Sequence, residues 1–305
     1  MPADLFFVND LAPMGLNLRS APDPNTNNIL AVLPNGHEVS KLADSQVTNW
    51  WRVKTSLNAS PLEGFVNSNF LSLSQEPAET FQGVKAVHLP TGSHMITRQG
   101  TGRAHPLTEV PPQKRRAADP PATRVAALNS LIDWFAVESS KRYRPGGGAT
   151  FCNIYAFDYV FMSEAYMPRV WWTGQALVKL QAGQSVPIKY GETVEELSAN
   201  SLNKWFKSWG EHFGWRRVFS LTEMQNEANA GKVCITVAQS KPNTHNGHGH
   251  IVAVVPETSD FKALRQNGEV VKTLQSQAGN HNREHVVQRF WDDGSYADFG
   301  HWVHD

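Results

Sequence analysis

The spacing of apolar residues changes along the chain, and this change restricts the fold to two unlike parts. Residues 16–72 contain short runs such as "LNLRS", "ILAVLPNG" and "WWRVKTS" between turn residues, which is typical of β-strands. From residue 122 onward, "ATRVAALNSLIDWF" places its apolar residues at helical spacing. A chain of 305 residues also exceeds the usual size of one domain. We therefore predict a small β-barrel followed by a larger domain.

The stretch between these parts, residues 76–121, is rich in Pro, Gly and small polar residues. Such a composition indicates a linker, or a long arm laid over the next domain. The sequence "KRR" at 114–116 is interpreted as a solvated charge cluster. The predicted organisation is thus 1–75, 76–121 and 122–305.

The second domain is predicted to place helices first and an antiparallel sheet after them. A buried central helix, "FCNIYAFDYVFM", follows "RPGGGAT" with Thr150 as its N-cap. A Thr193-x-x-Glu196 capping box opens another helix, which Gly210 ends. Three strand-like runs come next: "GKVCITVAQ", "HIVAVVPE" and "EVVKTLQSQAG". The segment "FWDDGSYADFGHW" near the end of the chain is expected to cover the sheet.

Residues 16–72 contain, in order, the pieces "LNLRSAP", "GHEVSKL", "WWRV" and "GFVNSNFL". Together these four pieces resemble the bacterial SH3-like domain. The resemblance implies a small barrel that binds cell-wall glycopeptide, or one that packs beside a peptidase and shapes its cleft. A barrel that binds nothing is the alternative.

The charge balance excludes a global field that would draw the protein onto nucleic acid or an anionic membrane. Lys plus Arg equal Asp plus Glu at 28 each. The first twenty residues lack a basic and then apolar signal segment, and no later run reaches the roughly 18 apolar residues of a membrane helix. We expect a protein without membrane insertion, made in the cytoplasm and delivered to the cell wall or periplasm by a non-Sec route.

Cys152 and Cys234 are the only cysteines, too few for a disulfide framework. Cys152 is predicted in the first turn of its helix, where free backbone N–H groups and the helix dipole favour a thiolate. The preceding "PGGG" allows a substrate backbone to approach, and the N–H of Cys152 is a candidate oxyanion donor. A small buried apolar residue is the alternative for Cys152 and the prediction for Cys234.

His250 stands where a Gly-rich loop meets the strand "IVAVV". This position holds the backbone firmly while it leaves the ring at a sheet edge, which suits a general base. His245, His248 and His250 do not have the helical i, i+4 spacing of zinc proteases, and no Cys pair or Asp completes a ligand set. We therefore predict no metal, and His245 and His248 are expected to be loop residues, with His248 beside the cleft.

A Cys that opens a buried helix, followed later by a "GHIVAV" strand, resembles the papain-like cell-wall hydrolases of the CHAP and NlpC families. The resemblance implies that Cys152 is the nucleophile, that His250 is the base and that no cofactor is needed. A third polar residue on the next strand would orient the imidazole. Gln277 is our choice for it, with Gln275 and Glu257 as alternatives. The surroundings of the cysteine, "TFCNIY", differ from those usual in either family, which leaves the scissile bond open.

Several other residues are candidates for substrate binding. Asn153 and Tyr155 follow Cys152 on its helix, although a core position is the alternative for Tyr155. In "YMPRVWWTG", Arg169 and Trp172 are candidates for a groove wall that holds a glycan or a peptide carboxylate, and the tryptophans are equally consistent with the core. His248 is the last candidate.

The sequence therefore predicts an α+β protein, an SH3-like barrel followed by a papain-like domain with helices packed on an antiparallel sheet. The predicted function is a peptidoglycan hydrolase, a cysteine amidase or endopeptidase that cuts stem-peptide or crosslink amides. A phage lysin and a type VI secretion effector, with an immunity protein as partner, are both consistent with it. The alternatives are a non-catalytic wall-binding protein and a cysteine protease or deamidase toxin that acts on proteins.

Overall fold

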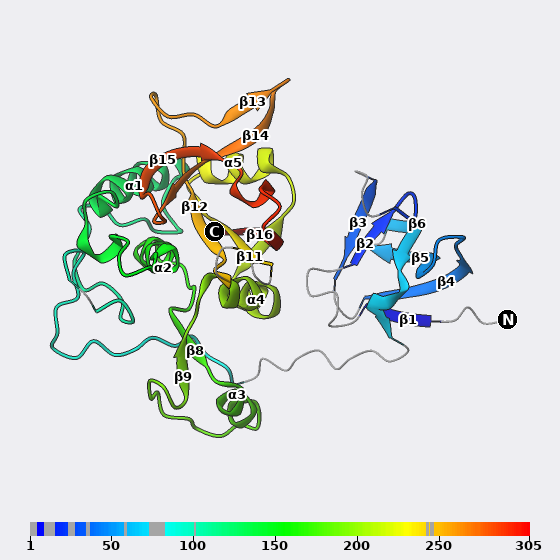
Figure 1. Cartoon of the computed structure of the whole chain (residues 1–305), viewed down its shortest axis with the longest axis horizontal. Coiled ribbons are helices and arrows are strands. Elements are labelled where there is room, and N and C mark those ends of the chain that lie inside the picture. The colour runs from blue at the N-terminus through cyan, green and yellow to red at the C-terminus, as the bar shows by residue number, and fades with distance from the viewer. Residues whose placement is uncertain are drawn as a thin grey trace. The chain divides into compact units, whose positions relative to one another are not determined.

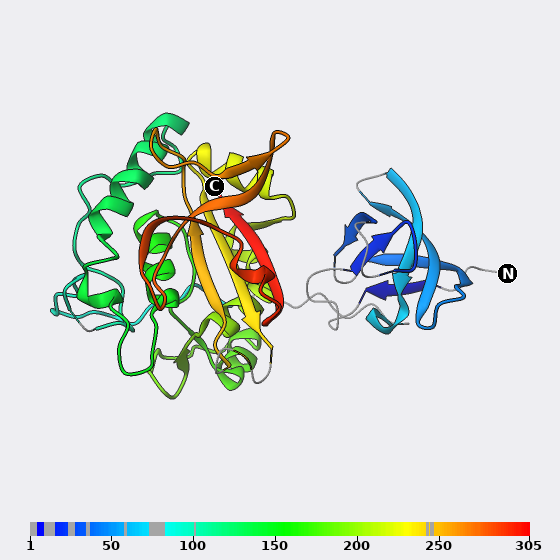
Figure 2. The same cartoon turned by 45° about the horizontal axis from the view of Figure 1, so that its top comes forward.

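Two compact units make up the chain, Met1–Phe81 and Gln82–Asp305 (Figures 1 and 2). The computed structural model describes residues 5–8, 16–23, 28–34, 37–57, 60–72, 83–100, 102–241, 244 and 247–305. The residues from 83 to 120 belong to the second unit, so they are an arm of that unit and no separate linker.

The first unit is all-β, with strands in the order β3-β2-β6-β5-β4-β1-β7. The runs "LNLRS", "ILAVLPNG" and "WWRVKTS" each contain a strand, and the apolar residues of this unit enclose a core that includes Leu18, Val39, Val53 and Val66. The elements are β1 (Leu5–Val8), β2 (Leu16–Arg19), β3 (Ile29–Leu33), β4 (Glu38–Asp44), β5 (Trp50–Leu57), β6 (Ser60–Asn67), η1 (Ser68–Phe70) and β7 (Leu71–Ser72).

The second unit contains an antiparallel sheet in the order β10-β16-β11-β12-β14-β13, with β15 paired to β14. A separate hairpin joins β8 and β9. The strands are β8 (Val170–Trp172), β9 (Val194–Glu196), β10 (Trp215–Val218), β11 (Val233–Ser240), β12 (His250–Val254), β13 (Leu264–Gln266), β14 (Glu269–Gln277), β15 (Arg283–Gln288) and β16 (Tyr296–His304).

The last strand corrects one prediction. The segment near the C-terminus was expected to cover the sheet, but β16 lies within it and pairs with both β10 and β11. Ile235 of β11 lies opposite Trp302, and Cys234 lies opposite Val303. The long apolar strand β11 needs partners on both edges to satisfy its backbone, and β16 supplies one of them.

Five α-helices are described in the second unit, and three of them pack on the sheet. Helix α2 lies against β12, α4 against β11 and α5 against β14 (Figure 1). Among the described helices, none is both long and apolar enough to cross a bilayer. The helices are α1 (Pro121–Phe135), α2 (Cys152–Met162), α3 (Gly174–Gln181), α4 (Ala199–Trp209) and α5 (Leu221–Asn229), with 3-10 turns η2 (Lys141–Tyr143), η3 (Glu211–Phe213) and η5 (Phe290–Asp292).

Both predicted helix starts are displaced. Helix α2 is preceded by Phe151, not Thr150, and no side chain caps it. Thr193 does not cap a helix, because its hydroxyl instead donates to Pro187 O at 2.6 Å while Glu196 ends strand β9. Helix α4 begins later, with Ser198 as the N-cap that accepts from the N–H of Ser201.

A further correction concerns the "KRR" cluster, because Arg115 in its middle is buried and not solvated. Its side chain is only 1% exposed and donates to the carbonyl of Gly231 at 2.9 Å and to that of Ser163 at 3.1 Å. These bonds anchor the arm to the ends of two helical segments, where carbonyl groups lack helical partners.

A buried ion pair joins the arm to helix α2. The guanidinium of Arg142 donates to both carboxylate oxygens of Asp158, at 2.6 and 3.0 Å, and both side chains are 0% exposed. Tyr143 donates to the same carboxylate at 3.0 Å. Arg142 also donates to the carbonyls of Gly102 at 3.2 Å and His105 at 2.9 Å. The pair therefore fixes the arm residues 102–105 against the helix that begins with Cys152.

Asp158→Ala should destabilise the second unit by about 3–5 kcal/mol, because it leaves the Arg142 charge buried without its partner. Glu192→Gln, which breaks the exposed Lys189–Glu192 pair, should cost less than about 1 kcal/mol. Denaturant unfolding of the two variants measures both values. Equal losses of unfolding free energy in the two variants would contradict the conclusion that the Arg142–Asp158 pair is a buried structural contact.

Candidate active site

Cys152 is the first residue of α2 and is 5% exposed. The backbone N–H groups of Ile251, Asn153 and Cys152 itself face its sulfur. Burial raises the pKa of the Cys152 thiol, and these N–H groups and the charge of Arg169 only partly oppose that rise. Burial of the sulfur therefore works against the resting thiolate expected from the sequence, because it disfavours the charged form.

His250 opens β12 and is partly buried. The preceding Gly249 has no room for a side chain, because a Cβ would clash with Asn200 and with the carbonyl of Ala238. Asn200 holds the loop from both sides, since it donates to Gly247 O at 2.7 Å and accepts from the N–H of Ser240 at 3.0 Å. The start of α4 therefore positions the backbone that carries the imidazole.

Gln277, at the end of β14, contacts His250 directly. Oε1 of Gln277 lies 2.5 Å from Nε2 of His250 and also accepts from Nε2 of Gln288 at 3.0 Å. The atom that faces Nε2 of His250 is the amide oxygen of Gln277, which can only accept, so in this arrangement the imidazole donates its Nε2–H to it. Nδ1 is then the basic nitrogen of the ring. Burial lowers the pKa of His250, and the bond to Gln277 opposes that decrease.

The two alternatives for this role lie elsewhere. Gln275 is fully buried, and its amide donates to Thr273 at 2.8 Å and to the carbonyl of Gln288 at 3.2 Å. Glu257 is paired with Arg265, whose hydrogen bonds lower the pKa of Glu257 to about 2. Of the three candidates, the structure brings only Gln277 to the imidazole.

Cys152 and His250 are neighbours through the backbone of β12. The sulfur faces the N–H of Ile251, the residue after His250. Both residues lie in the described part of the chain, which has no hydrogen bond between their side chains. Phe290 packs edge-on against the His250 ring, with 4.8 Å between the ring centroids. Tyr296 packs against Phe290 with 5.5 Å between their centroids. This aromatic wall was missed because "FWDDGSYADFGHW" was assigned to the outside of the sheet.

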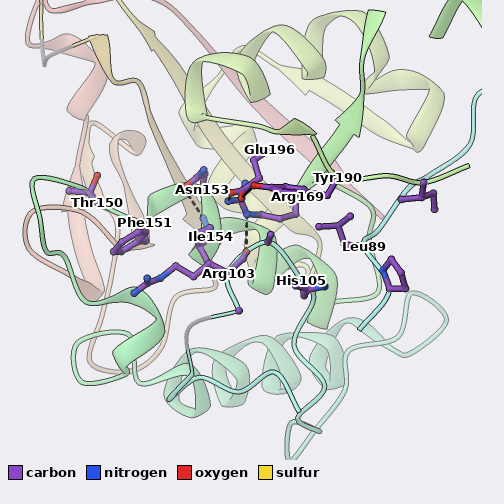
Figure 3. A pocket seen from close by; sticks show the side chains of 14 residues that line it. Leu89, Arg103, His105, Thr150, Phe151, Asn153, Ile154, Arg169, Tyr190 and Glu196 are labelled. Carbon is purple, nitrogen blue, oxygen red and sulfur yellow. Dashed lines mark hydrogen bonds and ion pairs between the residues drawn. The ribbon is translucent and has the colours of Figure 1, made fainter. Parts of the chain in front are cut away.

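A cavity of about 830 Å³ opens beside the start of α2 (Figure 3). Thr150, Phe151, Asn153 and Ile154 line one side, and Leu89, Arg103 and His105 of the arm line another; the β8–β9 segment contributes Arg169, Tyr190 and Glu196. Phe151 and Asn153 flank Cys152 in the sequence, so the cavity lies at the start of its helix, but Cys152, His250 and Gln277 are not among the residues that line it.

The predicted substrate-binding residues divide into two groups. Asn153 and Arg169 line the cavity, and Asn153 also donates to the carbonyl of Leu197 at 2.9 Å. Tyr155 and Trp172 do not, because both are buried in the core. The hydroxyl of Tyr155 is 2.6 Å from Oγ of Ser276, and burial raises its pKa, whereas Trp172 donates to the carbonyl of Lys85 at 3.2 Å. His248 is exposed on its loop, outside this lining.

Sequence reasoning missed the contribution of the arm. Arg103 and His105 come from "RQGTGRAHP", which has no periodicity or motif that would distinguish them. What places this segment at the cavity is a pair of hydrogen bonds from the buried Arg142 to the carbonyls of Gly102 and His105. These bonds exist only in the folded chain, so no sequence pattern predicts them.

The described residues contain no group of three or more His, Cys, Asp or Glu side chains placed to hold a metal ion. His245, one of the three histidines considered as ligands, lies outside the described residues. Cys234 is a buried strand residue whose thiol donates to the carbonyl of Met224 at 3.8 Å, as a small core residue would.

Comparison with known proteins gives little. No protein-family model matches the chain, and no curated protein matches it. Among solved structures, the structure of NlpC2 from Trichomonas vaginalis matches with 9% sequence identity and a TM-score of 0.26, over 98% of this chain and 71% of that chain. A likeness of this size establishes neither fold nor activity, so the case for a function depends on the geometry above.

Alkylation of Cys152 by iodoacetamide should accelerate with pH through a midpoint above about 8.5, the ordinary value for cysteine. The sign follows from burial, which disfavours the thiolate and so raises the pKa of Cys152. Mass spectrometry of the Cys152 peptide between pH 5 and pH 10, with glutathione as reference, measures the profile. A rate that is already maximal at pH 6 would reveal a thiolate–imidazolium pair and contradict this expectation.

Gln277→Met should release the imidazole from one tautomer while it keeps the side-chain volume. Loss of one hydrogen bond predicts about a tenfold decrease in any hydrolysis that uses His250. Nitrogen-15 shifts of the His250 ring should report Nε2–H in the parent and a tautomer mixture in the variant. Gln275→Met, on the same strand, is the control and should leave those shifts unchanged; identical shifts in all three proteins would refute the role of Gln277.

Proposed function

We propose that the second unit is a cysteine hydrolase of amide bonds, with Cys152 as nucleophile and His250 as general base. The observation that carries the proposal is the hydrogen bond from His250 to Gln277, because it leaves Nδ1 as the basic nitrogen. Nucleophile, base and orienting residue come from α2, β12 and β14, three separate elements that pack together. Such a trio has the nucleophile, base and orienting group of thiol-dependent acyl transfer.

In the proposed mechanism, Sγ of Cys152 attacks the carbonyl carbon while Nδ1 of His250 takes the thiol proton. The backbone N–H of Cys152 stabilises the oxyanion of the tetrahedral intermediate. When the intermediate collapses, the C–N bond breaks, the leaving amine receives the proton from Nδ1, and a thioester remains. Water then attacks the thioester and gives its proton to Nδ1; the carboxylic acid departs and Sγ regains the proton.

The raised pKa of Cys152 and the lowered pKa of His250 are compatible with this sequence of steps. Both shifts arise from burial and favour a neutral thiol beside a neutral imidazole. Proton transfer then accompanies attack and does not precede it, as general-base catalysis requires. Gln277 keeps its bond to Nε2 while Nδ1 gains and loses the proton.

Peptidoglycan is the substrate we propose, as an amidase or endopeptidase acting on stem-peptide or crosslink amides. Support comes from the all-β first unit, which carries the four pieces that resemble an SH3-like wall-binding domain. Delivery to the wall or periplasm by a phage lysis system or a type VI secretion system fits this substrate. An immunity protein is then the expected partner of a secreted effector.

One observation favours a second candidate, a non-catalytic wall-binding protein. The Cys152 thiol is 5% exposed, and the described chain has no hydrogen bond from it to His250. Catalytic hydrogen bonds can tighten only when substrate binds, so this geometry does not decide against catalysis. Wall binding without release of fragments would identify the second candidate.

Incubation of purified peptidoglycan with the parent protein should release new stem-peptide fragments, identified by mass spectrometry. Cys152→Ala should abolish the release, whereas Cys234→Ala, which removes the other thiol, should retain it. His250→Ala should also abolish it, and His248→Ala on the exposed loop should not. Release by Cys152→Ala at the parent rate would refute the mechanism, and toxicity confined to the cytoplasm of a target cell would indicate a protein substrate instead.

A further inference from the structure

Two arginines at the cavity differ in how their charges are compensated. Arg169 is 4% exposed and is paired with the carboxylate of Glu196, and it also donates to the carbonyls of Arg103 at 3.0 Å and Leu197 at 3.2 Å. Tyr190 donates to the same carboxylate at 2.5 Å. Both oxygens of Glu196 are therefore engaged, one by Arg169 and the other by Tyr190.

The guanidinium of Arg103 has no carboxylate partner among the described residues. It lies 3.8 Å over the ring of Phe151, and it donates from Nε to the carbonyl of Arg142 at 2.8 Å and from Nη2 to that of Lys141 at 3.2 Å. Within the described chain, Nη1 has no acceptor. Burial and the nearby charge of Arg142 lower the pKa of Arg103, so the site lacks an anion that would stabilise this charge.

The position of Arg103 is set before any ligand arrives. The aromatic ring below it and the two carbonyls beside it hold the guanidinium plane, and Arg142 holds the adjoining backbone through Gly102 and His105. Phe151 immediately precedes Cys152 in the chain, so this fixed cation lies at the start of the helix that carries the proposed nucleophile. An arginine held in one orientation binds a carboxylate at a smaller entropic cost than a mobile one.

We propose that Arg103 is a specificity-determining residue that binds a carboxylate of the substrate, in the residue next to the scissile amide. The inference rests on the proposed function and narrows its substrate class to peptides with a free carboxylate at that place. A neutral carboxamide there lacks the charge that this site compensates and should be cleaved less well. The guanidinium offers Nη1 and the planar geometry that carboxylates match.

The first test uses two alkylating agents of similar size on the full chain. The ratio of the iodoacetate rate to the iodoacetamide rate at Cys152, measured by mass spectrometry at pH 9, reports the local positive charge. Arg103→Gln should lower this ratio about fivefold, and added salt should lower it in the parent. Arg103→Lys should keep most of the ratio, and Arg144→Gln, which removes an exposed arginine of the nearby loop, should leave it unchanged.

The second test uses paired stem peptides that differ only in a free or amidated carboxyl group beside the cut bond. The parent should cleave the free acid about tenfold better by kcat/KM, and Arg103→Gln should abolish that preference. An alkylation ratio that is the same in parent and Arg103→Gln overturns the proposal even if the wall is hydrolysed. If the alkylation ratios are as expected but no peptide is hydrolysed, Arg103 is confirmed as an anion-binding residue and the proposed hydrolase function is refuted.

Discussion

The buried ion pair between Arg142 and Asp158 is the interaction on which the cavity depends. Asp158 belongs to α2. The guanidinium of Arg142 binds this carboxylate and also donates hydrogen bonds to the carbonyls of Gly102 and His105 in the arm. This pair therefore helps to fix the arm segment that includes Arg103 relative to the first turn of α2. A buried charge pair of this kind is costly to break, so it ties the fold of the unit to the shape of its cavity.

The candidate site has the same construction, because each functional side chain is held by an element other than its own. Asn200 of α4 fixes the loop before His250, and Gln288 of β15 fixes the amide of Gln277. Tyr155 of α2 reaches Ser276 of β14 and so ties the helix that begins with Cys152 to the strand that ends with Gln277. Side chains held in this way keep the imidazole in one tautomer and one orientation.

Sequence patterns predicted the elements whose period is locally clear. Helix α4 buries its apolar face, formed by Leu202, Trp205, Phe206 and Trp209, and the runs at β11, β12 and β14 are strands of one antiparallel sheet. The capping-box prediction was wrong, because a strand formed where the signal for a helix start stood. Residues Val194–Glu196 pair with Val170–Trp172, and no local pattern in either segment predicts this pairing.

The sequence by itself determined that a cysteine would begin a buried helix and that a histidine would begin a buried strand, because both depend on local periodicity and on glycine before the element. Only the tertiary structure decided which polar residue meets the imidazole. Gln275 and Gln277 are two residues apart on β14, so strand alternation alone predicts that both lie on one face. Their hydrogen-bond partners differ, because Gln277 binds the imidazole of His250 whereas Gln275 donates to the carbonyl of Gln288. The arm residue Arg103 joined the cavity for a similar reason: its place depends on long-range hydrogen bonds, which leave no trace in sequence spacing.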